Sequence, residues 1–109
     1  MNAHPALAAR RCRPQRDGVP DGPERQQLLS QLEGWSVVDN GLEKRFPFTD
    51  YARMISFVNA VAWLAQCEDH HPDLQIGWGR CTVRWRTHSV GGLSMNDFIC
   101  AAKVDALQP

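Results

Sequence analysis

Three of the four histidines in the chain fall within one short stretch, where their side chains could carry out proton-transfer chemistry. His70 and His71 stand together in the sequence Glu-Asp-His-His-Pro, and His88 follows a threonine further along. An imidazole has an unperturbed pKa of about 6.5, so it can donate or accept a proton near neutral pH. A strand, a turn and a second strand between these positions would bring His88 back towards the other two. The pooled histidines therefore indicate acid-base catalysis.

Each of these histidines also has a structural interpretation, which the residue types alone favour. His70 could cap a helix, His71 could be part of a surface loop, and His88 could be a polar residue at the end of a strand. A metal site is a further alternative, because Cys67 and His70 have the Cys-x-x-His spacing of a ligand pair and two more histidines are near in sequence. Against a metal site, the chain has no second closely spaced pair.

The whole arrangement of this stretch is more specific than its histidines. In order, it contains His70-His71-Pro72, Trp78, Thr87-His88, Gly91-Gly92-Leu93-Ser94 and Asp97. With this spacing, the chain from about Leu28 to Leu107 resembles the pterin-4a-carbinolamine dehydratase family. The family usually has a carboxylate four residues before the first histidine, where this chain has Gln66. Glu68 or Asp69 is expected to take over the role of that carboxylate.

The resemblance implies a hydro-lyase that eliminates water from a 4a-hydroxytetrahydropterin during tetrahydrobiopterin recycling. An acid would protonate the departing hydroxyl, and a base would take the proton from ring nitrogen N5. The family motif places His70 as the principal acid, His88 as the base or an orienting partner, and His71 as a second proton donor or substrate ligand. The reaction needs no metal or redox cofactor.

Further residues are expected at the substrate on the same resemblance, although each also has an ordinary structural role. Asp97 could simply be the third residue of a helix, and Trp78, like Trp85, could be a core side chain. Glu68 and Asp69 could be solvated charges after a helix. The substrate-binding positions implied by the resemblance are Glu68, Asp69, Pro72, Trp78, Thr87 and Asp97.

The expected partners follow from the resemblance and from the charge. The pterin would come from an aromatic amino-acid hydroxylase, and a homodimer or homotetramer is expected. Some family members act as dimerisation partners of a transcription factor, so a non-catalytic binding module is an alternative. Beyond residue 20 the chain has 8 basic and 11 acidic side chains, which argues against a nucleic-acid partner. The longest apolar run, 54–65, is too short to span a membrane.

The sequence pattern predicts an α+β domain over residues 21–109, in the order α-β-β-α-β-β-α, with a four-stranded antiparallel sheet and helices on one face. Apolar residues at helical spacing and capping signals predict helices near 23–33, 51–67 and 95–107. Alternating residues predict strands at 35–39, 42–46, 74–78 and 81–88.

Residues 1–20 differ in composition from the rest of the chain. They contain three prolines and four arginines with little apolar periodicity, which predicts a disordered tail that is dispensable for folding and turnover. A transit peptide is an alternative interpretation of the same composition. The four cysteines are far apart and form no Cys-x-x-Cys pair, which favours a reducing cytoplasm over a disulfide framework.

Overall fold

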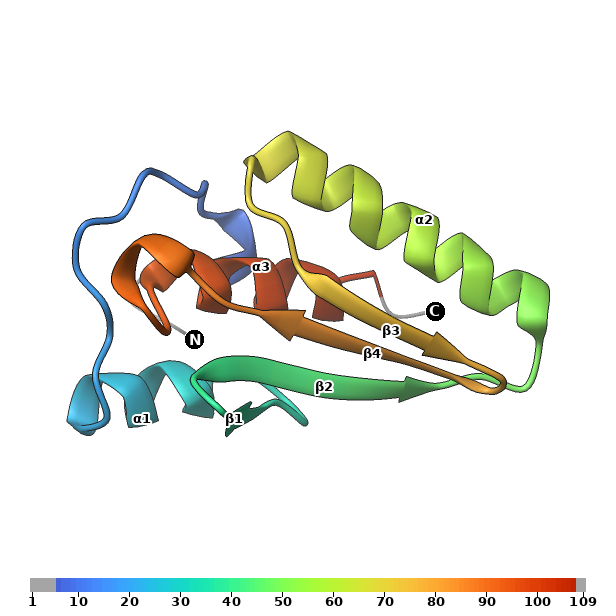
Figure 1. Cartoon of the computed structure of the whole chain (residues 1–109), viewed down its shortest axis with the longest axis horizontal. Helices are drawn as coiled ribbons and strands as arrows, with labels where there is room; N and C mark the ends of the chain where they lie inside the picture. The colour runs from blue at the N-terminus through green and yellow to red at the C-terminus, as the bar shows by residue number, and fades with distance from the viewer. Residues whose placement is uncertain (1–5, 108–109) are drawn as a thin grey trace.

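Residues 6–107 fold as three α-helices and a four-stranded antiparallel sheet, which confirms the predicted α+β class (Figure 1). The computed structural model describes residues 6–107. Its elements are, in chain order, the 3-10 helix η1 (Leu7–Ala9), α1 (Pro23–Ser30), β1 (Ser36–Val38), β2 (Gly41–Pro47), α2 (Tyr51–Glu68), β3 (Asp73–Gly77), β4 (Arg80–Trp85), the 3-10 helix η2 (His88–Val90) and α3 (Met95–Asp105). Among these helices, none combines the length and the apolar character needed to cross a membrane.

The strands are ordered β1-β2-β4-β3, so the longest two lie at the centre of the sheet. The β1–β2 hairpin forms as predicted. The dipeptide Asn40-Gly41 is typical of the two central residues of such a turn, but the turn lies one residue earlier. Asp39 and Asn40 are the residues with positive φ, at 47° and 61°. Gly41 instead begins β2, where a Cβ atom would collide with the guanidinium group of Arg84.

One face of the sheet forms the floor of the core. Leu42 is paired with Trp85, and Phe46 with Cys81, across β2 and β4, and all four side chains are buried. Directly paired residues point to the same face of a sheet. The apolar stripes of α2 and α3 cover this face, with the ring of Phe57 on α2 4.7 Å from that of Phe46. The other face carries polar side chains, namely Glu43, Arg45, Thr82 and Arg84.

Helix α2 is bounded by two aspartates. The Asp50 carboxylate accepts a hydrogen bond from the Arg53 amide at 3.1 Å and so caps the N-terminus, as predicted. At the other end, Asp69 adopts the left-handed conformation with φ 51° and terminates the helix. Asp69 turns the chain away from the axis of α2. The His70 side chain therefore points towards the N-terminal end of α3, where Asp97 lies.

The N-terminal segment differs from the predicted disordered tail over residues 6–20. Leu7 is buried in the core at 4% exposure and Val19 at 5%. The Val19 amide donates a hydrogen bond to the carbonyl of Leu93 at 2.7 Å. Figure 1 shows the segment running past the end of α2 before it reaches α1. Composition indicated disorder because these contacts are made mainly by the backbone and by isolated side chains, which leave no periodic pattern. Residues 1–5 lie outside the described part of the chain.

Candidate active site

His70 forms the shortest polar contact between the α2–β3 connection and α3. Its Nε2 atom lies 2.6 Å from Oδ1 of Asp97, and the two side chains are 12% and 0% exposed. The pair forms because Asp73 is paired with Arg84 at the open end of the β3–β4 hairpin. Residues just before β3 and just after β4 therefore leave the sheet at the same place, directly over the start of α3.

Two further groups bond to the Asp97 side chain and hold it in place. Its Oδ2 atom accepts hydrogen bonds from the Thr87 hydroxyl at 2.7 Å and from the Ser94 amide at 2.8 Å. The Ser94 hydroxyl is 2.7 Å from that of Thr87 and accepts a bond from the Asn96 amide, which completes a capping box. Asp97 is thus both the third residue of α3, as the structural interpretation predicted, and the partner of His70.

The His70 ring also stacks on Trp85. The ring centroids are 5.5 Å apart and the planes differ by 15°. Trp85 is fully buried on β4, so it provides an immobile surface for the imidazole. With one face against Trp85 and Nε2 bonded to Asp97, the ring has a single orientation. The bond to Asp97 occupies Nε2 and leaves Nδ1 as the other ring nitrogen that can exchange a proton.

The other two predicted catalytic histidines are more exposed. His71 follows His70 in the extended connection to β3, and His88 begins η2 just after the Thr87–Gly92 bridge. The topology places all three at the same end of the sheet, as the strand-turn-strand interpretation requires. Within residues 6–107, however, no hydrogen bond or ring stack links the imidazole of His70 to those of His71 and His88.

The two carboxylates that precede the histidines occupy different environments. The Asp69 side chain is exposed at the end of α2. The Glu68 side chain is only 6% exposed and bonds to the N-terminal segment and to Lys103. Desolvation raises the pKa of Glu68, but the Cys12 amide, the Lys103 ammonium group and the Arg11 guanidinium group outweigh it and hold the pKa below its ordinary value of 4.5. Glu68 is therefore an ionised structural anchor.

Two predicted substrate-binding residues lie on either side of β3. Pro72 immediately precedes the strand, beside the histidines. Trp78 lies in the turn after the strand, at the opposite end of the hairpin from Thr87, and is 77% exposed. It stacks on Tyr51 at a centroid distance of 6.2 Å. Within one chain, Trp78 is thus separated from the His70 cluster by the length of β3.

The cysteines and histidines do not assemble the alternative metal site. Among residues 6–107, no group of three or more histidine, cysteine, aspartate or glutamate side chains is arranged to hold a metal ion. Cys67 is exposed on α2, whereas His70 is turned towards Asp97.

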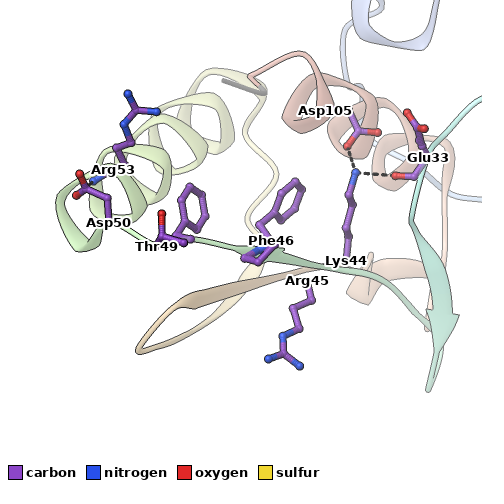
Figure 2. Close-up of a pocket in the computed structure, with 10 residues that line it drawn as sticks. Glu33, Lys44, Arg45, Phe46, Thr49, Asp50, Arg53 and Asp105 are labelled. Carbon is purple, nitrogen blue, oxygen red and sulfur yellow. Dashed lines mark hydrogen bonds and ion pairs between the residues drawn. The ribbon is translucent and has the colours of Figure 1, made fainter.

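A cavity of about 800 Å³ is lined by none of these residues (Figure 2). It lies between the start of α2 and the end of α3, above Phe46 and Phe48 on and after β2. Figure 2 shows Lys44 reaching Asp105 and the carbonyl of Glu33, at 2.9 and 2.6 Å. The Lys44 ammonium group is therefore already bonded to other groups of the fold. None of the predicted site residues lines this cavity, so size alone does not identify the chemistry.

Three residues of the cluster were not assigned to the site from sequence. Trp85 was considered a core residue, Ser94 only a helix cap, and Asn96 was not singled out. The Ser-x-x-Asp capping box is the one sequence signal that could have linked Ser94 to the site, because it places Ser94 beside Asp97 at the start of α3. No local pattern could have indicated that Trp85 would pack against an imidazole from another element.

The comparisons with known proteins agree on one family. The model of the family described as pterin 4 alpha carbinolamine dehydratase matches residues 20–107. A Nitrosomonas eutropha protein named for this dehydratase is 52% identical over 93% of this chain and 92% of its own length. A Nitrosomonas europaea protein of the same name is 50% identical over the same shares.

A solved structure supports the same relationship. The crystal structure described as a transcriptional coactivator/pterin dehydratase from Brucella melitensis matches with a TM-score of 0.72 and 32% identity. The match covers 76% of this chain and 90% of that one. Because the family match spans most of the sequence and the relatives align over nearly their whole length, this chain belongs to the pterin-4a-carbinolamine dehydratase family.

Proposed function

We propose that the protein catalyses the dehydration of 4a-hydroxytetrahydropterins at the cluster built around His70. Dehydratase activity follows from the family and from close relatives that carry its name. The observation that supports this location is the buried Asp97 carboxylate 2.6 Å from the half-enclosed imidazole of His70. A buried carboxylate that orients an imidazole is a recurring device of acid-base catalysis.

In the proposed mechanism, His70 is the acid. Asp97 holds a proton on Nε2, so proton exchange with the substrate takes place at Nδ1. When the ring carries a second proton at Nδ1, it can donate that proton to the 4a hydroxyl, which departs as water. The Trp85 ring prevents the imidazole from rotating away during this transfer.

His88 and His71 complete the proposed site. His88 lies next to Thr87 and would accept the proton from N5 of the pterin, or orient the base that does so. His71 and Asp69 are exposed beside His70, so they would contact the polar edge of the pterin. Pro72 fixes the extended geometry of His71. In this arrangement Asp69 supplies the carboxylate that the family usually has at the position of Gln66.

The direct test is dehydration of freshly prepared 4a-hydroxytetrahydropterin with and without the protein. The uncatalysed reaction gives the baseline, and catalysis should appear as a rate that increases in proportion to protein concentration. The same preparation should retain activity after exhaustive treatment with a metal chelator, because the mechanism uses imidazoles alone. A rate equal to the baseline at all protein concentrations would contradict the assignment.

We expect the protein to form a homodimer or homotetramer. Trp63 on α2 is 70% exposed, and Trp78 stacks on Tyr51 at the surface, so large apolar side chains remain for a second copy to cover. Sedimentation equilibrium at micromolar concentration should give a multiple of 12.3 kDa. Trp63→Asp should shift the population towards monomer. A wild-type protein that sediments only as a monomer would disprove this expectation.

The expected setting is a reducing cytoplasm that also contains an aromatic amino-acid hydroxylase, the class of enzyme that would supply the carbinolamine. All four cysteines are free, which supports a reducing compartment.

A further inference from the structure

Residues 6–20, called the strap below, are fastened to the end of α2 at Glu68. The Cys12 amide donates to Oε1 of Glu68 at 2.8 Å, and the Arg11 guanidinium group lies 3.1 Å from Oε2. Arg11 also donates to the carbonyl of Cys67 at 3.3 Å. That carbonyl is one of the last of α2, where helical partners are lacking. The strap thus provides a hydrogen-bond donor for a carbonyl of the last turn of α2, and it holds Glu68, which is two residues before His70.

The same strap is fastened to the first turn of α3 at Asn96. The Asn96 side chain accepts from the Arg13 amide at 3.0 Å and donates to the Arg13 carbonyl at 2.7 Å. This paired contact resembles the pairing of two strands and specifies the position of the strap backbone. Beneath it, Sγ of Cys12 lies 3.5 Å from Sγ of Cys100. The contact with Cys12, and then burial, raise the pKa of the Cys100 thiol, so Cys100 packs as a neutral group.

A third fastening ties both helices to the strap at once. The Lys103 ammonium group donates to the carbonyl of Ala8 at 2.8 Å and lies 3.6 Å from Oε2 of Glu68. Leu7 then inserts into the core beside α3. The strap therefore has contacts along much of α3 as well as at the end of α2.

These fastenings flank the two residues of the proposed catalytic pair. Glu68 precedes His70 by two residues, and Asn96 is the residue immediately before Asp97. We propose that the strap is a positioning element that holds the ends of α2 and α3 at the separation required by the bond between His70 and Asp97. The inference rests on the proposed function of that pair, and it makes Glu68 and Asn96 positioning residues.

This role differs from the substrate-binding role expected for Glu68. Its carboxylate is already bonded to Cys12 and Arg11, and its side chain is covered by the strap. A substrate ligand at this position would affect KM. A positioning residue would affect kcat, because it acts through the geometry of His70 on the bound substrate.

The test uses the full-length chain with Asn96→Ala, which removes both side-chain bonds to Arg13 and leaves every proposed catalytic residue unchanged. Glu68→Gln weakens the fastening at the end of α2, and the double variant combines the two changes. Lys44→Met is the matched control, because it breaks two bonds at the opposite end of α3, to Asp105 and Glu33. Release of the strap is followed by trypsin cleavage after Arg10 and Arg11.

Two measurements report positioning separately from stability. For Asn96→Ala and Glu68→Gln, kcat should fall about tenfold while KM changes less than about twofold, as expected for misplacement of a catalytic group. The NMR signal of the His70 Nε2 proton, assigned by its absence in His70→Ala, should move or broaden in both variants. Lys44→Met should lower the melting temperature but preserve kcat and the imidazole signal.

Faster trypsin cleavage with unchanged kcat and an unchanged imidazole signal would show that the strap has no positioning role. If neither single variant accelerates trypsin cleavage, the double variant is tested for cleavage, kcat and the imidazole signal in the same way, and the same results support or contradict the positioning role. A raised KM in Glu68→Gln with wild-type behaviour in Asn96→Ala would instead identify Glu68 as a substrate ligand and overturn the inference. Failure of the proposed function can be distinguished from failure of this inference. If the wild-type protein is inactive, the NMR signal of the His70 Nε2 proton in the variants still shows whether the strap positions the imidazole.

Discussion

Replacing His70 with alanine should lower dehydratase turnover by about 10²-fold or more, the usual scale for loss of a positioned acid or base. Within residues 6–107, the other groups that bond to the Asp97 carboxylate are the Thr87 hydroxyl and the Ser94 amide, which are buried and neutral, so neither can replace the imidazole as an acid. Turnover should be measured with fresh carbinolamine after subtraction of the spontaneous rate. Circular dichroism must confirm folding, because removal of the ring also exposes one face of Trp85.

His88→Ala should cause a loss of similar size, and His4→Ala should cause none. The double variant of His70 and His88 should be little worse than the worse single variant, because members of one catalytic unit do not contribute additively. If both single variants remain folded and retain near-normal turnover, the proposed active site is wrong. If only His88→Ala is neutral, the base must be another group, and the His70–Asp97 pair remains the proposed acid.

Replacing Asp97 with alanine should have the largest effect on stability, a loss of about 3 kcal/mol. The change leaves the Thr87 hydroxyl and the Ser94 amide without their acceptor in a fully buried site, and it removes the capping box of α3. For a domain of this size, such a loss corresponds to a decrease in melting temperature of about 10–20 °C. Thermal unfolding monitored by circular dichroism measures it directly.

Asp97→Asn separates catalysis from stability. The remaining amide oxygen can still accept from Thr87 and Ser94, but the amide nitrogen then faces Nε2 of His70 and donates to it. The proton of the ring moves to Nδ1, the opposite tautomer, and turnover should fall by about 10²-fold or more with little loss of stability. The control is Asp105→Asn, a half-buried carboxylate on the same helix that bonds to Trp35 and Lys44. Equal turnover in the two variants would contradict the proposed role of Asp97.

The order of elements was predictable because each was specified by local signals. Alternating residues specified β4, Asp50 and Ser94 specified two helix starts, and the Asn40-Gly41 dipeptide specified a hairpin to within one residue. Ends without such a signal were less well predicted. Helix α1 finishes at Ser30 rather than near Gly34, because Leu32 and its neighbours leave the helical conformation before the glycine.

The position of the three histidines at one end of the sheet was predictable, but the bonding of His70 was not. The pairing of His70 with Asp97 joins residues of two elements, and only the register of β3 with β4 brings them together. Trp78 shows that a residue of the sequence motif can also lie far from His70 within one chain, since it lies at the other end of β3. The contacts of the strap were not predictable for a related reason. Its stability depends on acceptors such as Glu68 and Asn96, which are distant in sequence and invisible to composition.

The strap also imposes an order on the synthesis of the protein. Residues 11–13 are made before their partners, which are residues 67, 68, 96 and 100, and the last two of these lie in α3, which follows the whole sheet in the sequence. Contacts between such distant segments form late, because the intervening chain must first be closed into a loop. While β3 and β4 are emerging, only the end of α2 is available for these contacts. The contacts at residues 96 and 100 require α3, so the His70–Asp97 pair should become fixed only once α3 has been made.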